Sequence, residues 1–227
     1  MTRSASGPAR HMPPRRHSHP VFARAYALLS RSEERFLADF RRELVADLSG
    51  RVVEIGAGNG LNFSHYPAEV AEVVAVEPEP YLRRQAERAA GQAPVPITVV
   101  AGVAEELPFA VGSFDAAVVS LVLCSVADPR RALAEIRRVI KVGGELRFYE
   151  HVQAQEPRLR RLQRLLDYVW PYLAGGCHTS RDTVALIESA GFAMERCRRF
   201  SFRPCLLAVP TSPQVIGRAC NGVGASA

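Results

Sequence analysis

The fold is decided by the stretch Val52-Val53-Glu54-Ile55-Gly56-Ala57-Gly58-Asn59-Gly60-Leu61, in which an apolar run leads directly into three glycines at alternate positions. The apolar run predicts a β-strand, and a helical pattern follows the glycines. Because glycine has no Cβ atom, it can turn the chain at positive φ and let a ligand lie against main-chain N–H groups. The spacing therefore indicates a ligand-binding turn after a strand, in preference to an ordinary tight turn.

Strand and helix patterns alternate along the chain around this turn. Apolar runs typical of strands buried on both faces lie at residues 51–55, 72–76, 96–100, 114–120 and 145–150. Helical patterns separate them at residues 61–67, 80–90 and 128–140. Gly143-Gly144 is expected to turn the chain before the fifth strand. Such regular alternation predicts an α/β fold with a doubly wound parallel sheet.

Two helices are expected before the first strand. Val21 and Tyr26 share one face of the first helix, and Ser30-Arg31-Ser32-Glu33 has the form of a capping box that begins the second. Residues 1–19, rich in Arg, Pro, His and Ser, predict a disordered tail. The remaining residues, 20–227, are expected to form a single domain.

The alternation loosens after the fifth strand. Helices are expected at residues 157–170 and 180–191, the latter capped by Ser180, and final strands at residues 192–200 and 215–220. Residues 152–180 are interpreted as a lid-like helical insertion over the carboxyl edge of the sheet. Ligands bind at that edge in doubly wound folds.

The helix expected at residues 157–170 has an apolar side and a basic side. The apolar side comprises Leu159, Leu162, Leu165, Leu166, Val169 and Trp170, and the basic side Arg158, Arg160, Arg161 and Arg164. Three interpretations stay open: a substrate lid, a weak contact with a membrane surface, and plain packing with a solvated basic face. A lid with this composition would imply an apolar acceptor.

Composition bounds the class of protein. Apolar residues make up 48%, which predicts a globular chain, and 29 basic against 23 acidic residues give a net charge of +6. The arginines are scattered over predicted helix faces, so we expect a solvated surface and no nucleic-acid partner. Five cysteines without a C-x-x-C pair fit neither a disulfide framework nor a zinc site, and therefore indicate a reducing cytosol. The longest charge-free apolar run, residues 116–127, is too short to span a bilayer, and no signal peptide precedes it, so we predict a soluble, cytoplasmic protein.

The ligand at the glycine turn is indicated by the residues around it. A dinucleotide fingerprint, G-x-G-x-x-G, would need glycine where Leu61 stands. The chain instead has E-x-G-x-G-x-G, with Glu77 at the end of the second strand, where a carboxylate can accept hydrogen bonds from both hydroxyls of a ribose. A nucleoside without a pyrophosphate is therefore favoured.

A family resemblance follows from these motifs and others along residues 50–195. The segments that carry it are Glu54 to Gly60, Glu77-Pro78, Ala104 to Phe109, Gly112 to Asp115 and Leu133 to Gly144. Together they resemble the class I S-adenosylmethionine-dependent methyltransferases with a methyltransferase type 11 domain. The resemblance implies an enzyme with a Rossmann-like, seven-stranded sheet whose last strand is antiparallel. It also implies S-adenosyl-L-methionine as cofactor.

The same resemblance implies roles for individual residues. Glu54 would orient the methionine amino group, the glycine turn would pass beneath the ligand, and Glu77 would hold the ribose. Related enzymes often have an aspartate for adenine where Val103 stands, so adenine recognition falls to the backbone of Val103 and Ala104 or to Glu105. The full cofactor-binding set is Glu54, Gly56, Ala57, Gly58, Gly60, Asn62, Glu77, Pro78, Val103, Ala104, Glu105, Ser120 and Leu121.

A narrower resemblance concerns the acceptor. Gly60-Leu61-Asn62-Phe63, Glu150-His151-Val152 and Gly176-Cys177 resemble the methyltransferase-like thiol methyltransferases of endoplasmic reticulum and lipid droplets and their bacterial relatives. This chain lacks the apolar N-terminal segment of the eukaryotic members, so membrane residence is not carried over. The resemblance implies a small lipophilic acceptor, with a thiol favoured.

Methyl transfer is an in-line attack on the sulfonium methyl group, so the protein chiefly positions both partners and excludes water. A thiol, with a pKa of about 8.5, needs less help to ionise than a phenol, whose pKa is about 10. His151 is the candidate base or acceptor-orienting residue, the alternative being a loop contact, and His178 is the second candidate. Direct transfer needs no covalent intermediate, so Cys124 is expected to pack in the core. Cys177 and His178 lack further ligands nearby in sequence, so no metal is expected.

Other functions stay open. One is oxygen or carbon methylation of a phenol or quinone, and another is a non-catalytic adenosylmethionine-binding module that regulates a partner. Nucleic-acid amine methylation is disfavoured, because Ser120-Leu121-Val122-Leu123 stands where those enzymes typically carry N-P-P-Y. The oligomeric state is left open.

Overall fold

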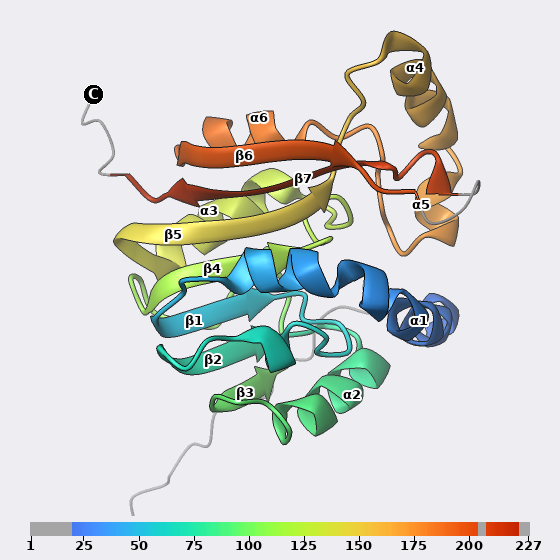
Figure 1. Cartoon of the computed structure of the whole chain (residues 1–227). Helices are drawn as coiled ribbons and strands as arrows, with labels where there is room; N and C mark the ends of the chain where they lie inside the picture. Colours follow the sequence, from blue (N-terminus) through green and yellow to red (C-terminus); the bar gives the residue numbers. More distant parts are fainter. Residues whose placement is uncertain (1–19, 204–207, 223–227) are drawn as a thin grey trace, which may run out of the picture.

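The computed structural model describes residues 20–203 and 208–222, which contain one seven-stranded sheet in the order β3-β2-β1-β4-β5-β7-β6 (Figure 1). The strands are β1 (Gly50–Ile55), β2 (Val70–Val76), β3 (Ile97–Val100), β4 (Phe114–Ser120), β5 (Ile140–His151), β6 (Ala193–Ser201) and β7 (Pro213–Cys220). Strand β7 runs antiparallel to both neighbours, and the other pairs are parallel. The predicted α/β, Rossmann-like sheet with an antiparallel last strand is confirmed.

Helices cover both faces of this sheet. They are α1 (Pro20–Val45), α2 (Pro80–Ala90), α3 (Pro129–Val139), α4 (Pro157–Leu166), α5 (Trp170–Leu173) and α6 (Thr183–Ser189). Because neighbouring side chains of a strand point to opposite faces, Val52 packs with α1 and α2, whereas Val53 packs with α3 and α6. This double cover explains why the central strands β1, β2 and β4 are largely apolar, whereas β6, at the edge of the sheet, carries exposed arginines and glutamate.

The first helix differs from the expectation. Residues 20–45 form one continuous helix, so the two-helix prediction was wrong. Ser30 lies inside this helix, where its Oγ accepts a 3.1 Å hydrogen bond from Asn59 Nδ2 of the glycine turn. The serine therefore serves a tertiary contact in place of a helix cap. The predicted tail, residues 1–19, lies outside the described residues.

The segment after the glycine turn is also shorter than predicted. Only a single 3₁₀ turn, η2 (Phe63–His65), stands where a helix over residues 61–67 was expected. Asn62 and Tyr66, on either side of this turn, both donate to the buried Glu54, and these bonds hold the segment as a turn.

Three boundaries after residue 139 were misplaced. Strand β5 begins at Ile140, so Gly143 and Gly144 lie within its bounds, at the irregularity where its pairing with β4 passes from Ile140 to Glu145; each glycine makes a main-chain bond of 2.8 Å to Asn221. The helix expected to reach residue 170 ends at Leu166, and α5 follows separately. The last helix begins after Asp182, which caps it, because Ser180 instead bonds Asp167.

Residues 152–180, predicted as an insertion, contain α4 and α5. Figure 1 shows α4 and α5 at the end of the molecule toward which β1 and β2 point. None of the helices in the described ranges has the length and apolar character that crossing a membrane requires.

Candidate active site

A cavity of about 890 Å³ lies at the carboxyl ends of β1, β2, β4 and β5, with α1 and the α5 region forming its other walls. Most of the predicted site residues line it, namely Gly56, Gly58, Glu77, Pro78, Val103, Ala104, Glu105, Ser120, Leu121 and His151. The predicted residues that do not line it are Glu54, Ala57, Gly60 and Asn62. The cavity thus lies at the carboxyl edge of the sheet, where the sequence predicted that a ligand binds.

The glycine turn closes one wall of the cavity. Gly56 and Gly58 have φ values of 68° and 59°, in the left-handed region that favours glycine. The N–H groups of Gly56 and Ala57 both donate to the Val76 carbonyl, at 2.8 and 3.1 Å. A Cβ atom on Gly56 would lie 2.5 Å from a methyl group of Val122. Glycine is therefore required at position 56 both by the backbone conformation and by the close packing of Val122.

Glu77 anchors this turn from the end of β2. Its two carboxylate oxygens accept hydrogen bonds from the N–H groups of Gly58, at 2.8 Å, and Glu79, at 2.9 Å. Burial raises the pKa of Glu77 to about 7 despite these bonds. Each carboxylate oxygen has a second lone pair, so both can still accept a hydroxyl of a ligand in the cavity.

Glu54 lies beneath the turn and away from the cavity. Its carboxylate accepts from Asn62 Nδ2 at 2.8 Å and from the Tyr66 hydroxyl at 2.7 Å, and Arg41 in turn donates to Asn62 at 2.8 Å. Burial raises the pKa of Glu54 to about 7. Through these bonds Glu54 supports the turn. Its contact with the methionine amino group of the cofactor stays a prediction.

The segment after β3 forms another wall of the cavity. Val103 and Ala104 line the cavity, as does Glu105. The Glu105 carboxylate accepts hydrogen bonds from the N–H groups of Ala127 and Asp128, at 3.1 and 3.3 Å. Both bonds go to Oε1, so Oε2 accepts from neither N–H group, and Glu105 stays a candidate for adenine together with the backbone of Val103 and Ala104.

The loop after β4 is held in an unusual conformation. Leu121 has a φ of 59°, which is rare for a residue other than glycine and is a form of strain found at functional sites. The buried Glu150 carboxylate accepts from three consecutive N–H groups, those of Val122, Leu123 and Cys124, at 2.8, 2.9 and 3.1 Å. Sequence reasoning gave Glu150 no such role, although a charged residue ending an apolar strand was the available signal.

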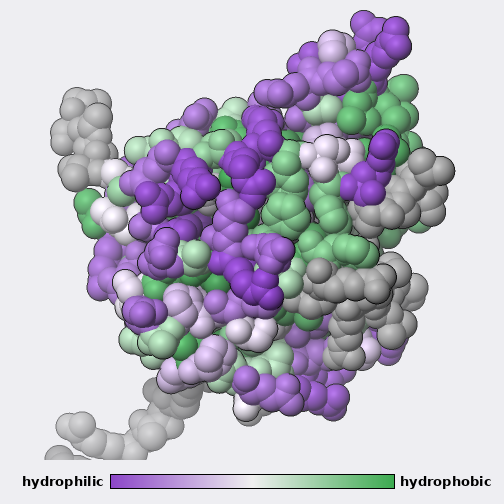
Figure 2. Space-filling view, viewed as in Figure 1, coloured by the Kyte–Doolittle hydropathy of each residue, from purple (hydrophilic) through white to green (hydrophobic). Residues whose placement is uncertain are grey.

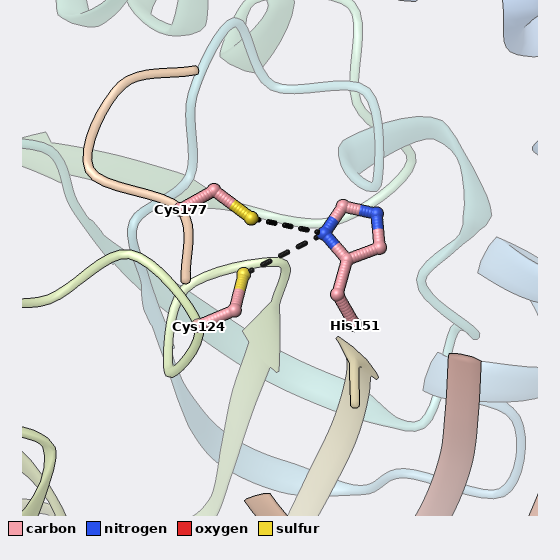
Figure 3. Close-up of side chains that lie close together, drawn as sticks. All are labelled: Cys124, His151 and Cys177. Atoms are coloured by element: carbon pink, nitrogen blue, oxygen red, sulfur yellow. Dashed lines mark hydrogen bonds between the residues drawn. The ribbon is translucent and has the colours of Figure 1, made fainter. Parts of the chain in front are cut away.

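Three side chains that are far apart in the sequence meet beyond this loop (Figure 3). His151 Nδ1 lies 3.7 Å from Cys124 Sγ and 3.4 Å from Cys177 Sγ, and the three atoms all lie within 4.8 Å of one another. Both cysteines are buried, and a hydrogen bond with Cys177 together with burial raises the pKa of the Cys124 thiol. Cys177 therefore groups with Cys124 and His151, whereas the sequence suggested only its neighbour His178.

Residues from the insertion and from α1 complete the cavity. Trp170 lines it, and its buried Nε1 is a donor without a hydrogen-bond partner within the described residues. Tyr26 faces the glycine turn, its ring lying 3.5 Å from where a Cβ of Gly58 would be. His178 also lines the cavity, and burial lowers its pKa. A ligand bound at the glycine turn would thus be covered from the side opposite the sheet.

Comparison with known proteins identifies the family. A methyltransferase domain matches residues 53–148. Thiol S-methyltransferase TMT1B of Homo sapiens is 30% identical over 205 residues, which cover 85% of this chain and 83% of that protein. The chain belongs to the class I S-adenosylmethionine-dependent methyltransferases. It is an enzyme whose cofactor is S-adenosyl-L-methionine.

Two further relatives of this methyltransferase extend the comparison. The demethylmenaquinone methyltransferase of Thermobifida fusca is 40% identical over 121 residues, which cover 52% of this chain and 51% of that protein. A crystal structure described as a methyltransferase dependent on S-adenosylmethionine, possibly a histamine N-methyltransferase, from Thermotoga maritima has a TM-score of 0.63 and 25% identity. It covers 88% of this chain and 98% of that one.

Proposed function

We propose that this methyltransferase moves the methyl group of S-adenosylmethionine to the thiol of a small lipophilic acceptor by in-line displacement. The observation that carries the proposal is the extent of the similarity to thiol S-methyltransferase TMT1B, which covers 85% of the chain. That coverage reaches beyond residue 148, where the domain match ends, and into the part that supplies His151, Trp170 and Cys177 to the cavity lining. The acceptor is held by that part.

The described residues fit the cofactor. S-adenosylmethionine supplies a methyl group on a positively charged sulfur. The glycine turn lets a ligand lie against backbone at Gly56 and Gly58, and the oxygens of Glu77 can accept the ribose hydroxyls. The main chain at Val103 and Ala104 is the remaining wall on that side and is proposed to bind the adenine.

The acceptor side of the cavity favours a lipophilic compound. Phe22, Leu37 and Trp170 line it, and their apolar surface excludes water from a reacting sulfur. His151, half-buried and lining the same cavity, is the group proposed to orient or ionise the acceptor. A thiol needs less help than a phenol at neutral pH, which suits a site with so much apolar surface.

A quinone or phenol acceptor is the second candidate. The demethylmenaquinone methyltransferase relative favours it, but that match spans 52% of the chain and is little longer than the domain itself. The alternative outside enzymes is a regulatory protein that binds adenosylmethionine and transfers no methyl group.

Matched acceptors test the proposal. We expect the purified protein, given S-adenosylmethionine, to methylate an alkyl thiol faster than a phenol or a reduced quinone of similar size, as measured by mass spectrometry of the products. Methylation of the phenol or quinone alone would support the second candidate. Tight cofactor binding without any methylated product across the panel would support the regulatory module.

A further inference from the structure

The cluster of Cys124, His151 and Cys177 has the dimensions of a metal site. Bonds of about 2.3 Å to sulfur and about 2.0–2.1 Å to nitrogen in a tetrahedral zinc site place a sulfur and a nitrogen ligand about 3.6 Å apart. The two observed separations from His151 Nδ1 to the sulfurs are 3.7 and 3.4 Å. All three ligand atoms lie within 4.8 Å of one another, so small side-chain rotations would bring the sulfurs to their tetrahedral separation.

The backbone that carries Cys124 is fixed from both sides. The Glu150 carboxylate takes the N–H groups of residues 122–124, and the Arg181 guanidinium donates to the carbonyls of Leu123 and Val126, at 2.7 and 2.8 Å. A loop held through both its donors and its acceptors keeps its side chains in place without the ligand, as a preformed site requires.

The backbone that carries Cys177 is brought against the same loop. The N–H of His178 donates to the Cys124 carbonyl at 2.8 Å. Gly176 has a φ of 89°, and a Cβ atom there would lie 2.7 Å from the Ser125 carbonyl oxygen. His151 stands at the end of β5, where its carbonyl accepts from the Thr183 hydroxyl at 3.2 Å. Three separate elements thus converge on one point.

The donor set and its surroundings favour a particular class of ion. Two thiolates and one imidazole select zinc and similar soft divalent ions over magnesium or calcium. Catalytic zinc sites have three protein ligands and leave the fourth position to water or substrate, whereas structural sites are closed by four. All three residues line the cavity that contains the glycine turn, so a fourth position would face the acceptor.

We propose that Cys124, His151 and Cys177 bind a zinc ion whose fourth position receives the acceptor thiol. This inference rests on the proposed thiol methylation and names how that site would ionise its substrate. The thiol releases its proton to solvent and its sulfur binds the zinc as a thiolate. A sulfur electron pair then forms the new bond to the methyl carbon, while the bond from that carbon to the sulfonium sulfur breaks and leaves its pair there. The thioether product carries no charge and leaves the metal. In this arrangement His151 acts as a ligand through Nδ1 in place of a base.

Metal content and cobalt substitution test the site without any assay of activity. We expect the full-length protein, isolated under reducing conditions, to bind about one zinc ion per chain by elemental analysis. After removal of the metal with a chelator, added Co²⁺ should produce the intense charge-transfer absorption of cobalt thiolates. Addition of an alkyl thiol should then change that spectrum, because it enters the fourth position.

Single variants assign the ligands. Cys177→Ser, in the loop after α5, and Cys124→Ser should each weaken Zn²⁺ binding by at least about 100-fold, because even outer-shell changes cost about 10–100-fold. Cys197→Ser changes an exposed cysteine on β6 and is the matched control, with unchanged Zn²⁺ affinity expected. Circular dichroism and the unfolding midpoint show whether each variant is folded.

The outcomes separate this inference from the proposed function. Thiol methylation by a protein that binds neither Zn²⁺ nor Co²⁺ would overturn the metal site and leave the function standing. A stable disulfide between Cys124 and Cys177 in the active protein would overturn it as well. Metal binding that requires both cysteines, with no methylation of thiols, would uphold the site and contradict the function.

Discussion

Two buried glutamates stand at the carboxyl ends of neighbouring strands and support the glycine turn from different sides. Glu77 is 4% exposed and lines the cavity, whereas Glu54 is 1% exposed and faces Asn62 and Tyr66. Burial raises the pKa of each carboxyl to about 7. The sequence predicted both as cofactor ligands, and the structure separates a cavity residue from a supporting one.

Replacing Glu77 should affect the cofactor directly. Glu77→Ala removes the acceptor of the Gly58 N–H and the proposed acceptor of the ribose hydroxyls. We expect S-adenosylmethionine binding, measured by calorimetry, to weaken by at least about 1–3 kcal/mol, the usual cost of an unmet buried polar group. Glu106→Ala, which changes an exposed carboxylate outside the cavity, is the control. Equal affinities in the two variants would sink the assignment.

Glu54 should give the protein a pH dependence of stability. The folded protein holds a proton on this carboxyl up to about pH 7, whereas the unfolded chain loses it near the ordinary pKa of 4.5. Its contribution is therefore fully present below pH 4.5 and is lost as pH rises toward about 7.

The variant Glu54→Gln isolates that contribution. Glutamine imitates the protonated carboxyl, because its oxygen can accept from Asn62 and its amide can donate to the Tyr66 hydroxyl. Between pH 4.5 and 7 we expect the variant to gain up to about 3 kcal/mol in free energy of unfolding relative to the unchanged protein, as measured with denaturant. A difference that does not vary with pH would contradict the raised pKa.

At the scale of elements, the proposed acceptor side of the cavity depends on contact between the loop after β4 and the loop after α5. Gly176 makes this contact possible, because its backbone lies close to the Ser125 carbonyl. The loop after α5 is not joined to a strand of the sheet, so the pairing of strands does not fix its position against the loop after β4.

Gly176→Ala should therefore separate two effects. The new side chain is strained at a φ of 89° and collides with the Ser125 oxygen. We expect a loss of about 1–3 kcal/mol in stability from strain, together with a large loss of methyl transfer and nearly unchanged binding of S-adenosylmethionine. Gly143→Ala has similar strain, at a φ of 79°, with nothing within 4 Å, and should keep its turnover. Similar turnover in both variants would show that the loop contact does not matter for the acceptor.

At the scale of the whole molecule, an apolar patch covers α4, α5 and the turn between them. Its exposed members are Leu162, Leu165, Tyr168, Val169, Tyr172 and Leu173. Figure 2 shows green residues gathered at the upper right, around these helices, with purple residues beyond them. Gln163 is the one buried residue of α4; packing half-buries Leu159 and Leu166 and leaves Leu162 and Leu165 exposed.

We propose that this patch rests on an anionic membrane surface, from which lipophilic acceptors reach the cavity. Exposed tyrosines and leucines beside the α4 arginines match the composition of helices that bind the interface. Each arginine near such a surface contributes roughly 1 kcal/mol, an attraction that salt screens.

Vesicles of phosphatidylcholine and phosphatidylserine test this contact. The protein should sediment with them and be released by high salt, and the double variant Leu165→Glu, Tyr172→Glu should lose the association. Val111→Glu with Val142→Glu changes two equally exposed valines elsewhere on the molecule, at 75% and 70% exposure, and is the control. Equal sedimentation of both double variants would exclude the patch as the contact.

The sequence by itself determined the sheet, the edge that binds ligand and most of the residues that line the cofactor side. These features depend on neighbouring residues: apolar runs mark buried strands, and the glycine spacing marks a turn that only glycine can make. The errors in the sequence predictions, such as Ser30 and Ser180 taken as helix caps, arose where a distant partner decides the local structure.

Only the tertiary structure brought together the residues of the proposed acceptor side. Cys124, His151 and Cys177 stand 27 and 26 residues apart, in segments with no shared pattern. They meet because β4 and β5 end side by side and the loop after α5 returns across both. Glu150 acquired its role in the same way, since its three N–H partners lie on another strand's loop. Such convergence follows from chain topology and packing, which no local pattern records.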